Sequence, residues 1–304
     1  MSEYHIPVML DQSVSALITN PDGIYADATF GGGGHTAAIL SRLHDGGRVI
    51  AFDRDIDALD NRIDDSRLTL IHNNFRFIEN FARQLDVHFD GILADLGVSS
   101  HQFDTADRGF SFRYDAPLDM RMNTEGGRTA ADLVNDAAEE DLARILRVYG
   151  EVDNARKVAQ FIVAARAKAP IRTTGDLDCA IAPALPKFAE HKHLAKVYQA
   201  LRIEVNGELR ALEKFLEGAV ASLSDGGRLV VITYHSLEDR MVKNFIRTGN
   251  VEGKEDKDLY GRVRTPLEAV NRKPILPEEE EIARNTRARS AKLRVAEKKT
   301  EVLS

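Results

Sequence analysis

The amino-acid sequence predicts a Rossmann-like, doubly wound α/β sheet that is interrupted by an all-helical domain. Over the first ~100 residues, short apolar runs alternate with helix-like stretches, a pattern typical of βαβ units. This alternation stops after Ser100, and only helical segments punctuated by prolines follow. The alternation of strands and helices then resumes. We therefore expect a discontinuous domain, residues 1–103 and 203–304, and a helical insertion, residues 104–202.

The first part of the chain contains the strands that define the sheet. Each candidate is a short apolar run, and helical stretches separate the runs, which favours a parallel sheet with right-handed crossovers. The expected strands are residues 24–28, 48–52, 68–71 and 89–94.

The last part of the chain continues the α/β pattern. Leucine and valine recur at helical spacing between Leu209 and Leu223, just before Gly226 and Gly227, which predicts an amphipathic helix. A buried strand, a helix, an irregular loop and a last edge strand with polar–apolar alternation are expected to follow. Their predicted ranges are residues 228–233, 237–247, 254–277 and 290–296.

Composition and charge narrow the class of protein. With 304 residues, 43% of them hydrophobic, the chain can bury a sizeable core. No run approaches the roughly 18 apolar residues of a membrane span, and no export signal is visible. The single cysteine, Cys179, excludes an internal disulfide, so we expect a cytoplasmic protein. The net charge of −7 argues against bulk electrostatic binding of nucleic acid. Residues 284–299 are strongly basic, and charge alone favours a solvated tail there.

A glycine-rich turn predicts a nucleotide-like cofactor. Four consecutive glycines, residues 31–34, follow the first strand and precede a helix, so the backbone can approach a ligand closely. Asp53 ends the next strand, where a carboxylate can accept hydrogen bonds from ribose hydroxyls. The spacing of Gly32, Gly34 and Ala37 also satisfies the dinucleotide fingerprint. An NAD-dependent oxidoreductase is therefore an alternative.

Three further residues favour S-adenosylmethionine as the cofactor. Asp27, at the end of the first strand, can hold a cationic amino-acid portion, which a dinucleotide lacks. Asp95 ends the fourth strand, where amino-group methyltransferases place a polar residue between the cofactor and the target nitrogen. Phe75, just after the third strand, is positioned to pack on an adenine ring.

Long motifs spread in order along nearly the whole chain give a more specific indication. Together they resemble the bacterial MraW-type (RsmH-type) ribosomal RNA cytosine-N4 methyltransferases. The matching stretches are HIPVML from residue 5, DATFGGGGHT from 27, AFDRD from 51, DGILADLGVSS from 90, RGFSF from 108, PLDMRM from 117, QALRIEVN from 199, HSLEDR from 235 and NTRARS from 285.

The resemblance implies a class I methyltransferase domain interrupted by a helical substrate-recognition domain. It implies methylation of a decoding-centre cytosine in the 16S ribosomal RNA, with S-adenosylmethionine as methyl donor. Whether the substrate is free RNA or an assembled small ribosomal subunit stays open, and the acidic net charge favours the subunit. Two departures are visible: the second glycine, Gly32, is often bulkier in the family, and Thr233 and Tyr234 stand where Ser-Phe is more usual. The cofactor residues implied by motif position are Gly33, Gly34, His35, Asp53, Phe75, Asp95 and Gln102.

For catalysis we expect Asp95 to orient the reacting groups while His235 and Ser236 contact the cytosine. The chain has no Asp-Pro-Pro-aromatic motif after the fourth strand, so the group that stacks on the base is not identified. The structural alternative is that His235 is a capping or core histidine and that Ser236 caps a helix, with Asp239 three residues on.

A segment after the fourth strand interleaves cations and aromatic rings, a combination that suits RNA. The alternative is a packed loop with Arg–Asp pairs. No metal-ligand set is predicted, because nothing completes a site around His191 and His193. A non-catalytic RNA-binding ribosome-assembly factor is a further alternative, and the oligomeric state is open, a homodimer included. The segment's residues are Arg108, Phe110, Phe112, Arg113, Tyr114, Arg121 and Arg128.

Overall fold

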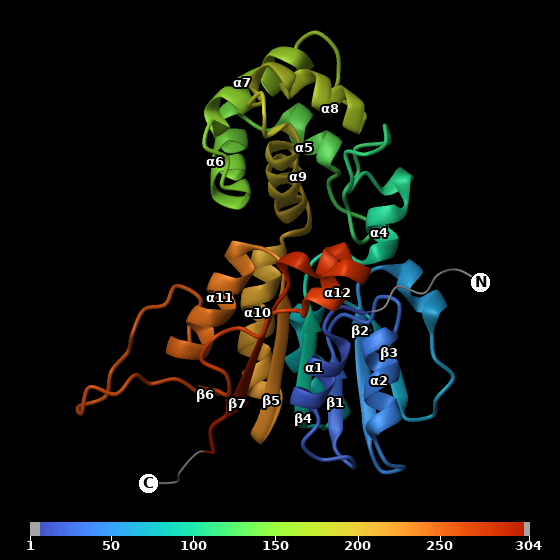
Figure 1. The fold of residues 1–304 in the computed structure, drawn as a ribbon, viewed down its shortest axis with the longest axis vertical. Helices are drawn as coiled ribbons and strands as arrows, with labels where there is room; N and C mark the ends of the chain where they lie inside the picture. Colours follow the sequence, from blue (N-terminus) through green and yellow to red (C-terminus); the bar gives the residue numbers. More distant parts are fainter. Residues whose placement is uncertain (1–6, 301–304) are drawn as a thin grey trace. The chain divides into compact units, whose positions relative to one another are not determined.

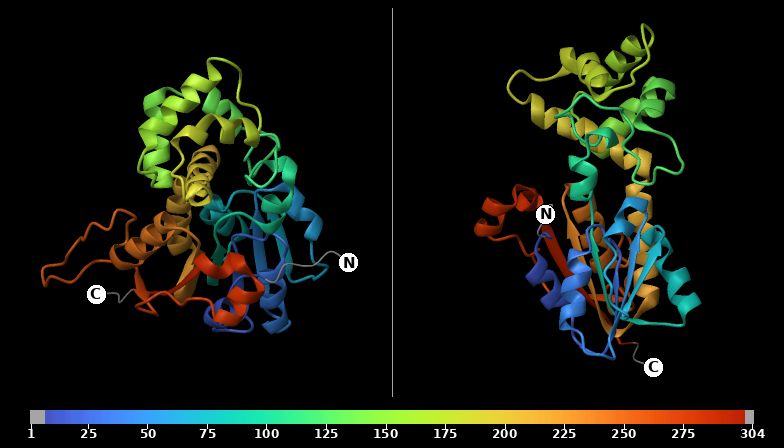
Figure 2. Two further views of the ribbon diagram at one scale, coloured as in Figure 1. Left: turned by 45° about the horizontal axis from the view of Figure 1, so that its top comes forward. Right: turned by 90° about the vertical axis from the view of Figure 1, so that its right-hand side faces the viewer.

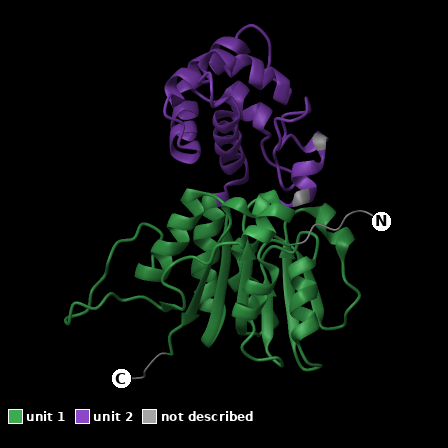
Figure 3. Cartoon of the chain, in the orientation of Figure 1, with its two compact units in different colours: residues 1–97, 209–304 green, residues 98–208 purple. Residues whose placement is uncertain are grey.

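The structure is a computed structural model that describes residues 7–300, apart from the side chains of Ser100 and Ala106. His5 and Ile6, which begin the first motif, lie outside the described residues. The chain divides into two compact units (Figure 3). Unit 1 combines the residues up to 97 with those from 209 onward, and unit 2 is residues 98–208. The boundaries predicted from the sequence, 103/104 and 202/203, lie a few residues inside unit 2.

Unit 1 is built on a seven-stranded sheet with the strand order β3-β2-β1-β4-β5-β7-β6 (Figure 1). Strands β1 to β5 pair in parallel, whereas β7 runs antiparallel to both β5 and β6. The predicted fold class, a Rossmann-like doubly wound sheet with a helical insertion, is confirmed. The strands are β1 Ile24–Asp27, β2 Arg48–Asp53, β3 Leu68–His72, β4 Phe89–Asp95, β5 Leu223–Thr233, β6 Leu267–Ala269 and β7 Lys292–Lys298.

The C-terminal part of the sheet differs from the prediction. The strand expected at an edge is β7, which lies between β5 and β6, and β6 occurs within the predicted irregular loop. The polar–apolar alternation of this segment predicts a strand with one face in solvent, but Leu293 and Ala296 of β7 are buried in two different hydrophobic cores, one on each face of the sheet. The expectation of a solvated basic tail is also wrong, because Arg294 is 8% exposed and its Nε donates to Asp239 at 2.7 Å.

Helices cover both faces of the sheet in unit 1 (Figure 2). Helices α1 and α2 pack Val14, Leu17 and Ile39 on one face, and α3, α10 and α11 bury their apolar sides on the other. Short 3₁₀ segments and α12 complete the unit. Their bounds are α1 Leu10–Leu17, α2 Gly34–Arg42, η1 Ile56–Asn61, η2 Phe75–Phe77, α3 Ile78–Leu85, α10 Glu208–Ser222, α11 Ser236–Thr248, α12 Glu279–Arg284 and η5 Thr286–Ser290.

Unit 2 is helical around a core of its own. In its described residues the β-structure consists of an isolated bridge between Pro117 and Thr173. Helix α9 continues beyond the predicted boundary and ends at Gly207, whose φ of +58° closes the helix in the left-handed region. The elements are α4 Ser100–Asp104, η3 Ala106–Arg108, α5 Ala130–Asp136, α6 Glu139–Gly150, α7 Ala155–Arg166, α8 Thr174–Ile181, η4 Ala182–Ala184 and α9 Glu190–Asn206.

The topology of unit 1 determines where a ligand can be bound. Because β1, β2, β4 and β5 run parallel, their carboxyl ends meet at one edge of the sheet, where ligands of open α/β sheets bind. Asp27, Asp53, Asp95 and Thr233 each end one of these strands. None of the helices in residues 7–300 combines the length and the apolar character that crossing a membrane requires.

Candidate functional site

The glycine turn after β1 adopts a conformation that favours glycine at two positions. Gly31 has a φ of +51° and Gly33 a φ of +76°, both in the left-handed region. Gly33 is also the N-cap of α2, and no side chain caps this end of the helix within the described residues. The backbone N–H groups that begin α2 therefore suit an anionic group. A Cβ on Gly32 would meet nothing within 4 Å, which explains why a bulkier residue can stand there.

Asp27 lies beneath this turn rather than in the site. Its side chain is 0% exposed, and its two oxygens accept hydrogen bonds from the Thr29 N–H (3.1 Å) and the Thr36 hydroxyl (2.7 Å). The prediction that Asp27 contacts a cationic amino-acid portion is wrong, because a fully buried carboxylate presents no surface to a ligand. Its role is to join the end of β1 to the start of α2.

Asp53, at the end of β2, holds the same turn and is partly accessible. Its two oxygens accept hydrogen bonds from the N–H groups of Gly31 and Asp55, both at 2.8 Å. Burial raises the pKa of Asp53, while these two hydrogen bonds lower it. A carboxylate has about four lone-pair positions, so two are left for the hydroxyls of a ribose.

Phe75 follows β3 and begins η2, at the same edge of the sheet. Its ring is half-buried and packs edge-on against Phe215, with the ring centroids 5.1 Å apart. The hydrogen bond from the Arg76 N–H to the Asn74 side chain (3.0 Å) caps this short 3₁₀ segment. A fixed aromatic ring with an exposed part suits the face of a purine.

Asp95, at the end of β4, is a carboxyl group whose pKa the site perturbs strongly. Its Oδ1 accepts a hydrogen bond from the Tyr234 hydroxyl at 2.6 Å, and its Oδ2 lies 3.9 Å from Nδ1 of His35. The Asp95 N–H donates to the hydroxyl of Thr29 at 2.7 Å. Burial raises the pKa of Asp95 to about 6, although His35 and the Tyr234 hydroxyl both act to lower it. Its side chain is still 22% exposed, so a ligand can reach it.

His35 connects Asp95 to the N-terminal segment. It is the second residue of α2 and is 5% exposed. Its Nε2 lies 3.2 Å from the carbonyl oxygen of Val8, and its Nδ1 faces Asp95. The predicted cofactor residues Gly33, His35 and Asp95 are thus brought together in one unit.

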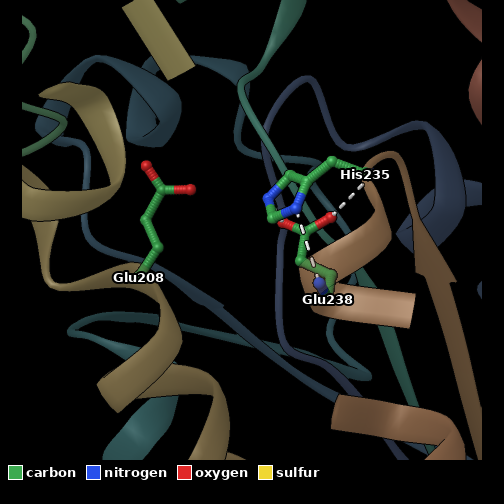
Figure 4. Close-up of side chains that lie close together, drawn as sticks. All are labelled: Glu208, His235 and Glu238. Carbon is green, nitrogen blue, oxygen red and sulfur yellow. Dashed lines mark hydrogen bonds and ion pairs between the residues drawn. The ribbon is translucent and has the colours of Figure 1, made fainter. Parts of the chain in front are cut away.

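His235 caps helix α11, as the structural alternative predicted. Its Nδ1 accepts a hydrogen bond from the Glu238 N–H (3.4 Å), and its Nε2 lies 3.0 Å from Oε1 of Glu238 (Figure 4). Glu238 is buried and also accepts from the Tyr234 N–H at 3.0 Å. Glu208, drawn in the same figure, belongs to unit 2 and pairs there with Arg202 at 2.9 Å.

Ser236 is not the cap that the sequence alternative proposed. It is the first residue of α11, and its side chain is exposed. Asp239 does not close a capping box either, because its carboxylate pairs with Arg294 (2.7 Å) and Lys292 (3.3 Å) of β7. Histidine is not among the usual capping residues, so the sequence pattern favoured the neighbouring serine.

Gln102 belongs to unit 2, unlike the other predicted cofactor residues. It is 5% exposed, and its side-chain oxygen accepts from the Ser99 N–H at 3.1 Å. The Ser99 hydroxyl accepts from the Gln102 N–H at 3.2 Å, which completes a capping box at the start of α4.

The Arg- and Phe-rich segment of unit 2 is for the most part a packed loop. Arg108 is 8% exposed and donates to the carbonyls of Arg121 and Met122, each at 3.1 Å. Arg121 forms an ion pair with Asp119 at 2.7 Å.

The rest of this segment divides into inward and outward side chains. Arg128 pairs with Asp136 at 3.5 Å, and Phe110 and Phe112 pack in the core of the unit. Arg113 and Tyr114 have exposed side chains, 57% for Tyr114. Arg128 is also exposed, 45% for its side chain, but Asp136 engages its guanidinium, so Arg113 and Tyr114 are the better suited to contact RNA.

Sequence reasoning missed three residues that shape the site. Tyr234, Glu238 and Thr29 all contact predicted site residues or their backbone, yet none was predicted to take part. The signal for Tyr234 was its position directly before His235 and the departure from the more usual phenylalanine. For Thr29 the signal was its place two residues after Asp27 in the turn.

Comparison with known proteins gives matches along almost the entire chain. A family model described as the MraW methylase family matches residues 2–299. A relative from Bacteroides fragilis named ribosomal RNA small subunit methyltransferase H is 57% identical over 297 residues, which are 97% of this chain and 98% of the relative. A relative of the same name from Flavobacterium johnsoniae is 52% identical over 297 residues, 97% of this chain and 98% of the relative. The solved structure of an rRNA methylase from Streptococcus thermophilus aligns with 95% of this chain and 93% of that chain, at 14% identity and a TM-score of 0.39.

Proposed function

The chain belongs to the MraW methylase family, and from this premise we propose that it methylates N4 of a decoding-centre cytosine in 16S ribosomal RNA, with S-adenosylmethionine as methyl donor. The observation that carries the proposal is the Asp95 carboxylate beside the glycine turn, which the Tyr234 hydroxyl holds, while the Thr29 hydroxyl holds the Asp95 backbone N–H. The names of the relatives support ribosomal RNA as the substrate. The motif resemblance supports cytosine as the methylated nucleotide and N4 as the acceptor atom. A ribosomal substrate would place the protein in the cytoplasm.

The residues at the carboxyl edge of unit 1 fit this cofactor. The uncapped start of α2, at Gly33 and Gly34, suits the carboxylate of its amino-acid portion. Asp53 has lone pairs left for the ribose hydroxyls, and Phe75 offers a partly exposed ring to the adenine. When bound, S-adenosylmethionine supplies a methyl group on a positively charged sulfur, which a nearby carboxylate such as Asp95 favours.

Cytosine's exocyclic amine is a weak nucleophile, so the protein must contribute mainly by positioning it. In the proposed reaction, Asp95 accepts a hydrogen bond from one N–H of the amine and directs the nitrogen lone pair at the methyl carbon. As the N–C bond forms and the C–S bond breaks toward sulfur, Asp95 stabilises the positive charge on the nitrogen and takes one of its protons. The base must be unstacked from the RNA to reach this edge.

His235 and Ser236 remain the proposed contacts to the cytosine ring. The exposed hydroxyl of Ser236 can exchange hydrogen bonds with a base edge. His235 has a structural role as the cap of α11, so a contact with the base would be its second role.

The test is methyl transfer from labelled S-adenosylmethionine to small ribosomal subunits from a strain that lacks the enzyme. We expect one labelled nucleotide, N4-methylated cytosine in the decoding centre, and parallel reactions with free 16S RNA show whether an assembled subunit is needed. Label on a different nucleotide would contradict the proposed specificity. Absence of transfer would favour a non-catalytic assembly factor, and a thermal shift with NAD in place of S-adenosylmethionine would favour an oxidoreductase.

A further inference from the structure

The hydroxyl group of Tyr234 contacts the proposed reacting carboxylate without itself reaching the substrate in the proposed reaction. We propose that Tyr234 is a positioning residue for methyl transfer, whose hydroxyl fixes the orientation of the Asp95 carboxylate and keeps it ionised near neutral pH. This inference rests on the proposed function and adds a residue to it.

The position of Tyr234 follows from the register of the sheet. Asp95 at the end of β4 pairs with Ile232 of β5, and Tyr234 follows directly after β5. The tyrosine therefore leaves the sheet beside the carboxylate, and its hydroxyl reaches Oδ1 of Asp95 at 2.6 Å. This is the short distance expected when a hydroxyl donates to a charged oxygen.

The tyrosine is held at both ends, so its hydroxyl has little freedom. Its N–H donates to Glu238 at 3.0 Å, and Glu238 in turn faces the His235 cap. A Cβ on Gly97 would lie 3.3 Å from Cδ2 of the ring, so the backbone after β4 passes close over the tyrosine. Gly97 has a φ of +104°, which glycine alone adopts without strain.

With Oδ1 of Asp95 occupied by the tyrosine, the second oxygen is directed elsewhere. Oδ2 lies on the side of His35, 3.9 Å from Nδ1, and the Asp95 backbone is fixed by Thr29. The carboxylate therefore presents a defined oxygen to a substrate amine instead of rotating between two equivalent positions.

The charges around Asp95 and Tyr234 explain why the uncharged hydroxyl of Tyr234 matters as a hydrogen-bond donor. Burial raises the pKa of Asp95, and the carboxylates of Asp27 from β1 and Glu238 from α11 add to the rise. Opposing them are His35 from α2 and the hydroxyl of Tyr234. The pKa of Tyr234 is itself raised by burial, by Asp95 and Glu238 and by Glu281 of α12, so the hydroxyl keeps its proton and stays a donor.

The experiment compares Tyr234→Phe with the wild-type enzyme in methyl transfer to small subunits between about pH 5 and pH 9. Wild-type activity should fall below about pH 6, where Asp95 becomes protonated. Without the hydroxyl we expect the acid limb of the pH profile to move up by about one pH unit, which alone lowers kcat at about pH 7 about twofold. Loss of the fixed carboxylate orientation should bring the total decrease in kcat to about tenfold. KM for S-adenosylmethionine should change less than about threefold, because Tyr234 acts on Asp95 and not on the cofactor.

Tyr198→Phe is the matched control. The Tyr198 hydroxyl is also buried and donates to a carboxylate, Asp178, at 3.0 Å, but it lies in unit 2. Its removal should leave the pH profile unchanged. A Tyr234→Phe profile that superimposes on that of the wild type, or a change in KM for S-adenosylmethionine alone, would overturn the proposal.

A second variant keeps the test decisive if Tyr234→Phe does not fold. Difluorotyrosine at position 234 keeps the ring and strengthens the donor, so the acid limb should move to lower pH; an unmoved limb would overturn the inference. If the wild-type enzyme itself transfers no methyl group, the proposed function fails instead. The pKa of Asp95 can then be followed by carboxyl-carbon NMR in the wild-type and Tyr234→Phe proteins, which tests the contact between Tyr234 and Asp95 without an activity assay. Equal pKa values in the two proteins would overturn the inference.

Discussion

At the scale of a single residue, the ionised carboxylate of Asp95 is needed for the proposed reaction but lowers the stability of the fold. Its pKa is raised from 3.8 to about 6, so the folded chain binds the proton more tightly than the unfolded chain does. The contribution of Asp95 to the free energy of unfolding is therefore greatest below about pH 4, and it is lost as the pH rises through about 6. Such a carboxylate is retained because its charge is useful.

We expect Asp95→Asn to stabilise the protein above about pH 7 while it abolishes methyl transfer. One pKa unit corresponds to about 1.4 kcal/mol, so the pKa shift of Asp95 limits the gain in free energy of unfolding to about 3 kcal/mol. Because 22% of the side chain is exposed, a gain of about 1–2 kcal/mol is expected. Denaturant unfolding at about pH 5 and pH 8 measures it, with the exposed Asp86→Asn as control. A gain that is equal at both pH values would contradict the assignment.

Asp53 combines two tasks, since it holds the glycine turn and is proposed to bind the ribose. For Asp53→Ala we expect the affinity for S-adenosylmethionine, measured by calorimetry, to fall about thirtyfold or more, because hydrogen bonds to a carboxylate are lost. The exposed Asp60, nearby in η1, gives the control substitution Asp60→Ala, which should bind normally. Unchanged affinity in the Asp53 variant would exclude the ribose contact.

The positions of these residues were predictable to different degrees. Gly33, Asp53 and Asp95 lie at strand ends or in the turn between β1 and α2, so short apolar runs in the sequence suffice to find them. The same signal found Asp27, but no pattern tells which way a side chain turns, and Asp27 turns beneath Thr36. The contact between Tyr234 and Asp95 depends on the register of β4 and β5, which the sequence does not specify.

At the scale of elements, His235 has one role as the N-cap of helix α11 and a second, proposed role as a contact to the cytosine, and substitutions can distinguish the two. His235→Ala should lose about 1 kcal/mol of stability together with activity, because it removes the cap. His235→Asn should regain the stability, since asparagine is a preferred N-cap, without restoring an imidazole. Thermal unfolding and methyl transfer, measured on both variants, distinguish the roles. Wild-type activity in His235→Asn would end the case for a catalytic histidine.

The strands show which elements can be read from local sequence. β1 to β4 are short apolar runs closed by an acidic residue, glycine or a turn, and their predicted limits lie within a residue of the observed ones. β7 has a local pattern too, but its place between β5 and β6 depends on Leu293 and Ala296 packing on opposite faces. Such long-range packing has no signature within the strand itself.

At the scale of the whole molecule, each unit has its own hydrophobic core, and no described segment of strongly basic residues remains as a free tail. The chain is acidic, with a net charge of −7, so binding of RNA must rest on a few selected side chains. In the segment of unit 2 that was predicted to contact RNA, Arg113, Tyr114 and Arg128 have exposed side chains, and Arg128 is paired with Asp136.

We expect Arg113→Glu to weaken binding to small subunits about tenfold at low salt and to reduce the salt dependence, with unchanged affinity for S-adenosylmethionine. Arg147→Glu makes the same charge change on an exposed face of α6 and serves as the control. Filter binding at several salt concentrations measures both variants. Equal losses in the two would indicate a general effect of charge and argue against a contact at Arg113.

The position of β7 between β5 and β6 has a consequence for synthesis of the protein. The nascent chain presents β1 to β5 first, and the outer edge of β5 stays unpaired until residues 292–298 have left the ribosome. That edge belongs to an apolar strand, in which Leu229, Val230, Val231 and Ile232 are all buried in the finished sheet. A chain that stops before β7 would expose it, and an open apolar edge invites aggregation. Premature termination near the end of the message should therefore yield insoluble protein instead of a slightly shortened enzyme.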